Sequence, residues 1–116
     1  MDSRLISPRI ELVRGDTGPQ IKLTITDEAT GAVADLTDGS AVLHFRAEDS
    51  TTLLFSRNLN IPSGTADEGI AYIQWGADDL DQTPGDYEGE VEVTFGSGLR
   101  QTVYDTLKFR IRDEFA

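Results

Sequence analysis

The side chains of this chain best suited to binding a metal are clustered acids. Asp67 and Glu68 come before an apolar run, and Asp78, Asp79 and Asp81 come after it. Ca²⁺ favours such carboxylate oxygens, but the spacing does not match that of an EF-hand loop. Two interpretations follow: weak Ca²⁺ binding at a loop end, or solvated turn and capping residues. The second is the simpler one, and we assign no metal ligand and no cofactor.

The chain has a single histidine, His44, which falls on the polar side of a predicted strand. Nucleophilic catalysis needs a nucleophile and an orienting acid that converge on such a histidine. Paired carboxylates of the glycosidase type would need an aromatic-lined groove, for which one tryptophan and three tyrosines are few. We therefore predict no catalytic residue and a protein that is not an enzyme.

Two short motifs carry little functional information. Arg14-Gly15-Asp16 spells the tripeptide that integrins recognise, but the residues around it, Gly15-Asp16-Thr17-Gly18-Pro19, are turn formers. The glycines are dispersed and do not follow the strand, glycine-rich loop and helix order of a phosphate site. We interpret both features as turns.

Composition narrows the class of partner. The chain has 116 residues, which suits one domain, and no cysteine, which excludes a disulfide. Its 21 acidic and 10 basic side chains give a net charge of −11, which repels nucleic acid and anionic membranes. The acidity serves solubility, or docking on a basic protein surface. Since no apolar run is long enough for a signal peptide or a membrane span, we expect synthesis in the cytoplasm without signal-peptide secretion.

Short alternating segments separated by turn formers predict strands throughout the chain. The expected strands cover residues 10–14, 20–26, 33–36, 40–48, 51–58, 69–75, 87–95 and 107–112, with one helical turn at 77–80. No segment predicts a long amphipathic helix. We predict an all-β protein, an immunoglobulin-like antiparallel β-sandwich of about 7–9 strands without a disulfide. The sandwich spans residues 9–112, between an N-terminal arm at 1–8 and a C-terminal tail at 113–116.

The clearest alternation lies between Tyr87 and Arg112, on both sides of Gly96-Ser97-Gly98. It predicts a hairpin with one apolar face and one charged face. Cross-strand ion pairs on the charged face would fix the register. The expected partners are Glu88 with Arg112, Glu90 with Arg110, and Glu92 with Lys108.

Trp75 and Tyr87 match two hallmarks of immunoglobulin-like sandwiches. Trp75 is expected in the core at the end of the most apolar strand. Pro84-Gly85-Asp86-Tyr87 resembles a tyrosine corner, in which the phenol bonds back to the upstream loop. Gly89 stands where an antibody-type domain has its second cysteine, which excludes the disulfide-bearing lineage.

The order of these motifs resembles that of the small immunoglobulin-like domains of tailed-phage virion proteins. The resemblance covers residues 10–112 and rests on four motifs in succession: Gly15-Asp16-Thr17-Gly18-Pro19, Asp35-Leu36-Thr37, Gly69–Trp75 and Pro84–Val91. The N-terminal module of siphophage baseplate upper proteins is one similar domain, and small stand-alone tail or head proteins are others. Multi-domain baseplate members also contain a coiled-coil stalk or a receptor-binding segment, and we expect neither within residues 1–116.

The resemblance implies a non-enzymatic structural protein of the virion. Such a protein would be an adaptor or decoration subunit of the tail, baseplate or capsid that binds other virion proteins and forms a homo-oligomer. The outer face of the Gly69–Trp75 strand and the segment Met1–Arg9 are the expected docking surfaces. The alternative is a carbohydrate- or receptor-binding module, with Tyr72, Trp75 and Tyr104 as its aromatic candidates.

Overall fold

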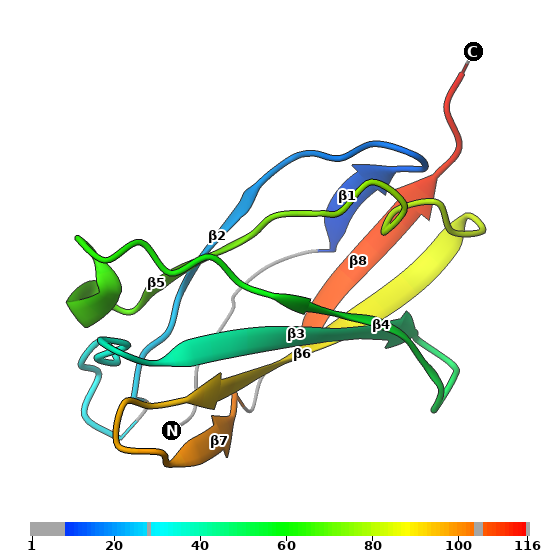
Figure 1. Cartoon of the computed structure of the whole chain (residues 1–116). Helices are drawn as coiled ribbons and strands as arrows, with labels where there is room; N and C mark the ends of the chain where they lie inside the picture. Colours follow the sequence, from blue (N-terminus) through cyan, green and yellow to red (C-terminus); the bar gives the residue numbers. More distant parts are fainter. Residues whose placement is uncertain (1–8, 28, 104–105, 116) are drawn as a thin grey trace.

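The structure is a computed structural model that describes residues 9–27, 29–103 and 106–115. These residues form eight strands and one short 3₁₀ helix (Figure 1). The elements are β1 (Ile10–Val13), β2 (Ile21–Thr24), β3 (Ser40–Ala47), β4 (Leu53–Asn58), η1 (Ala66–Glu68), β5 (Ile70–Ile73), β6 (Gly85–Thr94), β7 (Arg100–Thr102) and β8 (Leu107–Arg112). In the described part of the chain, no helix has the length and apolar character needed to cross a membrane.

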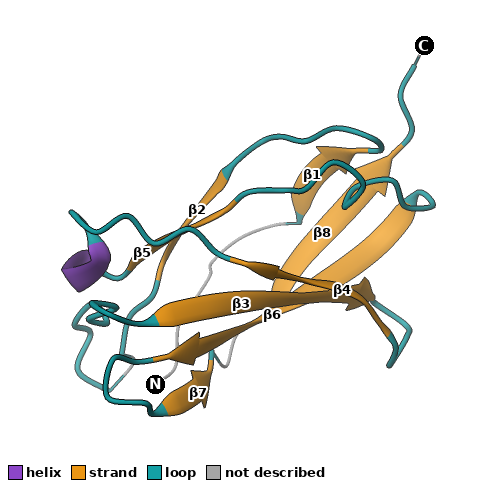
Figure 2. Cartoon of the chain, in the orientation of Figure 1, coloured by secondary structure: helices purple, strands orange, loops and turns teal. Residues whose placement is uncertain are grey.

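The strands form two sheets that face each other as a sandwich (Figure 2). The larger sheet has the order β1-β8-β6-β3-β4, with β7 also paired to β6, and the smaller sheet consists of β2 and β5. The prediction of an all-β, immunoglobulin-like sandwich without a disulfide is confirmed. One pair departs from the antiparallel prediction, because β1 and β8 run parallel. A parallel pair needs a long crossover, and the rest of the domain lies between these two strands.

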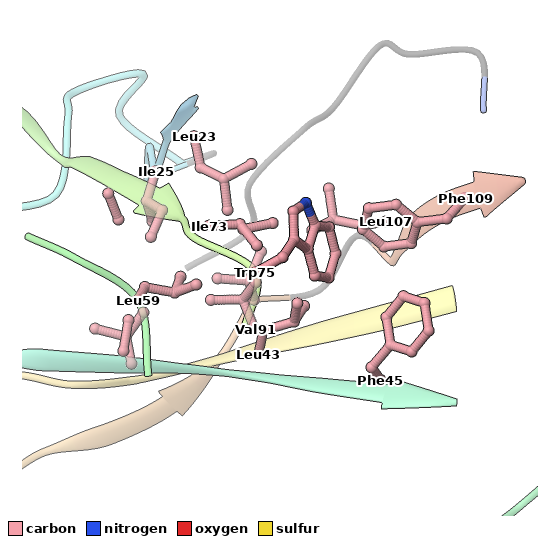
Figure 3. Packing of buried hydrophobic residues seen from close by; sticks show 14 of the residues in the cluster. Leu23, Ile25, Leu43, Phe45, Leu59, Ile73, Trp75, Val91, Leu107 and Phe109 are labelled. Carbon is pink, nitrogen blue, oxygen red and sulfur yellow. The ribbon is translucent and has the colours of Figure 1, made fainter. Parts of the chain in front are cut away.

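The core fills the space between the sheets, and strand alternation directs side chains into it. On β3, Leu43 and Phe45 are fully buried, while His44 and Arg46 are half-buried on the opposite face. An aromatic cluster surrounds Phe45, whose ring centroid lies 4.8 Å from Phe55 and 5.3 Å from Tyr87. Figure 3 shows the indole of Trp75 between the two sheets, close to Leu43, Val91, Leu107 and Phe109.

The predicted hairpin is wrong in its partner strand. After the Gly96–Gly98 turn the chain forms β7, which pairs with the end of β6, with Thr94 opposite Arg100. β8 pairs with the beginning of β6, with Glu88 opposite Lys108 and Tyr87 opposite Phe109. The ten-residue β6 is long enough to accept two short strands along one edge. The alternation of each strand is as predicted, but alternation alone does not reveal an intervening strand.

Three further local predictions need correction. Residues 33–36 do not form a strand; Val33 makes only an isolated bridge with Thr26. β5 ends at Ile73, so Trp75 lies just beyond it rather than within it. Residues 66–68, which were not predicted to be helical, form η1, and Gly69 ends this helix in a left-handed conformation with φ 73°. A Cβ at Gly69 would come within 2.5 Å of the carbonyl oxygen of Ile25, so only glycine fits this turn.

Candidate functional site

The outer face of the larger sheet carries a network of opposite charges. We call its seven members the charge ladder: Arg9, Arg46, Glu48, Asp86, Glu88, Lys108 and Arg110. Glu88 is at its centre, with Arg46 Nη2 at 2.7 Å and Lys108 Nζ at 2.9 Å from its two carboxylate oxygens. These two side chains cover Glu88 and leave it 8% exposed. Three adjacent strands, β3, β6 and β8, are thus joined by one carboxylate.

The second rung of the charge ladder lies where β1 begins. Arg9 donates to both carboxylate oxygens of Glu48, at 2.6 and 3.2 Å. Arg110 Nε donates to Asp86 at 3.0 Å, and Arg9 Nε lies 3.9 Å from the same carboxylate. The ladder therefore aligns the strands of the larger sheet, and two of its members, Arg46 and Glu88, line a small pit.

The carboxylates of the charge ladder are held ionised. The hydrogen bond from Lys108, followed by that from Arg46, lowers the pKa of Glu88. Hydrogen bonds from Arg110 and Arg9 likewise lower the pKa values of Asp86 and Glu48. A carboxylate with a lowered folded-state pKa stabilises the fold above its unfolded pKa, near 4, and the effect is lost as the pH falls through the folded pKa.

The lowered pKa of Glu88 predicts how the stability of the Glu88→Gln variant depends on pH. At pH 7 the variant should be less stable than the wild type by about 1 kcal/mol, because both cations are partly exposed and screened. Below about pH 4 the difference should shrink, since the wild-type carboxylate becomes protonated as well. Urea unfolding of the wild type and the variant at pH 7 and pH 3 measures this difference in the free energy of unfolding. Glu11→Gln, at an exposed glutamate of β1, is the matched control, and a difference that grew in acid would contradict the prediction.

The structure separates the other residues of the predicted cross-strand ion pairs. Glu90 lies opposite His44, and Glu92 lies opposite Val42 and Thr102. Arg112 donates to the backbone carbonyl of Asp113 at 2.8 Å and lies over the ring of Phe115, 4.8 Å from its centroid. The pairs Glu88–Arg112, Glu90–Arg110 and Glu92–Lys108 are therefore wrong, because β8 pairs nearer to the start of β6. Asp86 was missed because the predicted strand began one residue later.

His44 lies on the outer face beside a hydroxyl. Its Nδ1 is 2.7 Å from Ser56 Oγ on β4, and Glu90 is its cross-strand neighbour on β6. A pit of about 60 Å³ is lined by His44 and Glu90 together with Arg46, Leu53 and Glu88. Such a volume suits about two water molecules rather than a substrate. His44, Ser56 and Glu90 lie on the open outer face of the larger sheet. There the hydrogen bond between His44 and Ser56 connects β3 to β4, which is a structural role.

The clustered acids take different partners. Asp79 binds Arg57, and Asp81 accepts a hydrogen bond from Arg14 Nε at 3.1 Å. Asp67 and Glu68 are exposed on η1. Among the described residues, no group of three or more acidic or histidine side chains is arranged to hold a metal ion.

The ion pair of Asp79 is the most buried in the described chain. Arg57 on β4 donates two hydrogen bonds to the carboxylate, at 2.8 and 2.5 Å, and the Gly76 N–H adds a third at 2.7 Å. Burial raises the pKa of Asp79, but these hydrogen bonds and the nearby charge of Arg57 outweigh it, so the pKa is lowered overall. The pair fixes the turn after β5 to the edge strand of the larger sheet. Sequence patterns did not indicate it, since Arg57 and Asp79 lie on different elements.

Tyr87 and Trp75 are buried, and each donates a hydrogen bond to a backbone carbonyl. The hydroxyl of Tyr87 donates to the backbone carbonyl of Thr83, the bond that characterises a tyrosine corner. Pro84 lies in the bend between these residues, and Gly85 begins β6 opposite Ile111. Trp75 is 6% exposed, and its Nε1 donates to the carbonyl of Pro19 at 3.0 Å. Gly89 is enclosed by the core, because a Cβ there would come within 2.7 Å of Leu43 Cδ1.

Tyr87→Phe tests the corner. Removing the hydroxyl should lower the free energy of unfolding by about 1 kcal/mol, because the Thr83 carbonyl loses its partner. Equilibrium urea unfolding measures the change. Tyr72→Phe, at the half-buried tyrosine of β5, is the matched control and should be neutral within about 0.5 kcal/mol. Equal losses in the two variants would show that the corner contributes nothing specific.

Of the two expected docking surfaces, the outer face of β5 is described by the structure, and the N-terminal arm is not. On the outer face of β5, Ile70 and Tyr72 are half-buried rather than open. The arm at 1–8 and Tyr104 lie outside the described residues. The most exposed large apolar side chains of the described strands are instead Leu53 (50%) and Leu54 (44%) on β4. The sequence predicted a strand at residues 51–58 but did not indicate that it would be a docking surface.

Comparison with known proteins yields one structural likeness. No protein-family model matches the chain, and no curated protein matches it significantly. Among solved structures, CopC from Methylosinus trichosporium OB3b is similar, with a TM-score of 0.54 over 95% of this chain and 89% of that chain. The two sequences are 10% identical, so the likeness shows the fold alone.

Proposed function

We propose that this chain is a non-enzymatic structural protein of a tailed-phage virion, an adaptor or decoration subunit that acts by binding other virion proteins. Its place is the particle, in the tail, baseplate or capsid, after synthesis in the host cytoplasm. The proposal starts from the succession of four motifs in the sequence. It gains support from what the residues of these motifs do in the folded chain.

The motif residues are fixed in the folded domain by hydrogen bonds and by burial. Pro19, which ends the first motif, accepts the hydrogen bond of Trp75, which ends the third. In the second motif, Asp35 Oδ1 accepts from the Thr37 N–H at 3.0 Å, and Leu36 is fully buried. In the fourth, Tyr87 forms the corner with Thr83. The shared motifs are thus the framework of the domain, which is the observation that carries a scaffold function.

The alternative, a carbohydrate- or receptor-binding module, needs an exposed aromatic platform. Trp75 is buried and bonded to Pro19, so it is not available for stacking on a sugar ring. A fluorescence spectrum of the native protein separates the two functions. We expect the blue-shifted emission of a buried tryptophan, whereas emission at the wavelength of a water-exposed indole would favour the alternative.

Protein identification in purified phage particles tests the proposal. Particles of the phage or induced prophage that encodes the chain are banded on a density gradient and analysed by mass spectrometry. We expect peptides of the chain to co-purify at a stoichiometry comparable to that of other tail or head proteins. A replication protein of the same phage is the control for cytoplasmic carry-over. Absence of the chain from intact particles, or presence only at the control level, would overturn the proposal.

A further inference from the structure

β4 is an edge strand that is protected against pairing by neither proline nor an uncommitted charge, although a register shift at Leu54 interrupts its pairing with β3. It ends the order of the larger sheet, so one side pairs with β3 and the other side pairs with no strand in the described part of the chain. Natural edges are usually blocked by exposed charges, proline or strong twisting. The sequence of β4, Leu-Leu-Phe-Ser-Arg-Asn, has no proline, and its single charge, Arg57, is bound to Asp79.

The other edge strands differ from β4. β5 has no charge either, but its side chains are buried or half-buried, and Tyr72 forms a bridge with Asn60 at its outer edge. β1 exposes Glu11, β2 exposes Lys22, and β7 exposes Arg100. β4 instead exposes Leu53 and Leu54. Among the described strands, β4 therefore combines an open edge, exposed apolar side chains and no uncommitted charge. Exposed apolar side chains next to unpaired backbone groups indicate a site where another strand adds to the sheet.

The charge distribution indicates what that strand belongs to. Residues 50–66 contain no acidic side chain, although the whole chain has 21 acids and a net charge of −11. A basic partner would find no counter-charge along this segment. A second copy of the same acidic chain, in contrast, would meet no acidic side chain on this strand, so charge repulsion opposes pairing less here than at acid-rich surfaces. The acid-free edge thus favours a second copy as its occupant.

We propose that two copies of this chain pair antiparallel through β4, which joins their larger sheets into one continuous sheet. A twofold axis near Phe55 or Ser56 places the two Arg57 residues on opposite sides of the axis, so like charges do not face each other. Such a contact uses the same surface on both copies and closes at two. This inference deepens the proposed docking function and rests on it only for its biological setting, since the test needs the purified protein alone.

Sedimentation equilibrium of the full chain, at several protein concentrations and physiological salt, tests the pairing. We expect a reversible dimer of twice the 12.7 kDa chain mass. Leu54→Glu should raise the dissociation constant about 100-fold or more, because it removes an apolar side chain from the contact and places a charge where water is excluded. Leu99→Glu is the matched control, with the same change in charge at a residue that is 62% exposed outside any strand. It should leave the dissociation constant within about threefold of the wild type.

Hydrogen exchange provides a second measurement. The amides of β4 should become more protected as the protein concentration rises, while those of β2 should not change. Circular dichroism and thermal unfolding of both variants ensure that a lost dimer is not a lost fold. A monomeric wild type, a trimer or larger ring, or a dimer broken equally by the two substitutions would each overturn the inference. None of these outcomes bears on whether the chain is found in phage particles.

Discussion

Replacing Phe45 with alanine should lower the free energy of unfolding by about 3–5 kcal/mol, the usual loss for a fully buried phenylalanine. Phe45 is 0% exposed, and its ring lies against four other aromatic rings. Besides Phe55 and Tyr87, these are Trp75 at 5.8 Å, edge to face, and Phe109 at 5.3 Å between centroids. The substitution would leave a cavity between the two sheets. Since small domains have about 5–15 kcal/mol of stability in total, the variant would be close to unfolding.

Urea unfolding followed by the fluorescence of Trp75 measures the effect, because the indole lies beside the cavity and is the only one in the chain. Phe45→Leu should cost less, about 1.5 kcal/mol, since it fills part of the space. Phe115→Ala is the matched control: this phenylalanine is 96% exposed, and its loss should change stability by about 0.5 kcal/mol at most. A Phe45→Ala variant as stable as the control would contradict the described core.

Replacing Asp79 with alanine should lower the free energy of unfolding by about 3 kcal/mol. Breaking a buried ion pair usually costs about 3–5 kcal/mol, and we expect the lower end because the Arg57 side chain is 40% exposed and can recover some hydration. The Gly76 N–H loses its acceptor at the same time. The turn after β5 would then be released from β4, while the hydrophobic core remains unchanged.

A double-mutant cycle with Arg57→Ala isolates the pair. Chemical unfolding of both single variants and the double variant should give a coupling energy of at least about 1 kcal/mol. Asp78→Ala, at the exposed aspartate just before Asp79, controls for loss of a charge in the same turn and should leave the stability unchanged. Additive losses from Arg57 and Asp79 would mean that each acts alone and that the pair does not connect the turn to the strand.

Much of the fold could be read from local pattern, because strand alternation is a local property. Trp75 was expected in the core, and the alternation along residues 40–48 puts Leu43 and Phe45 on one face of their strand; all three are buried. The tyrosine corner is local as well, since Tyr87 and Thr83 are only four residues apart. The all-β class and the absence of a disulfide follow from the same local information together with the composition.

Local pattern could not predict which distant segments pair with each other. The alternation of residues 107–112 predicts a strand, but it fits β6 equally well at registers that differ by two or four residues. The charges did not resolve this, because each register places some glutamate or aspartate opposite a cation. In the folded chain, β7 occupies one half of β6 and thereby moves β8 to the other half.

The candidate docking edge depends on such long-range facts most of all. The residue types of β4, its lack of acids and its two leucines are present in the chain as written. That β4 ends a sheet, and that the charge of Arg57 is committed to Asp79, are consequences of contacts between segments far apart. Local propensity therefore specified the strands and the inward faces of most of them. Packing of the whole domain specified which strand edge and which charges remain free, because each is defined by what the other elements leave uncovered.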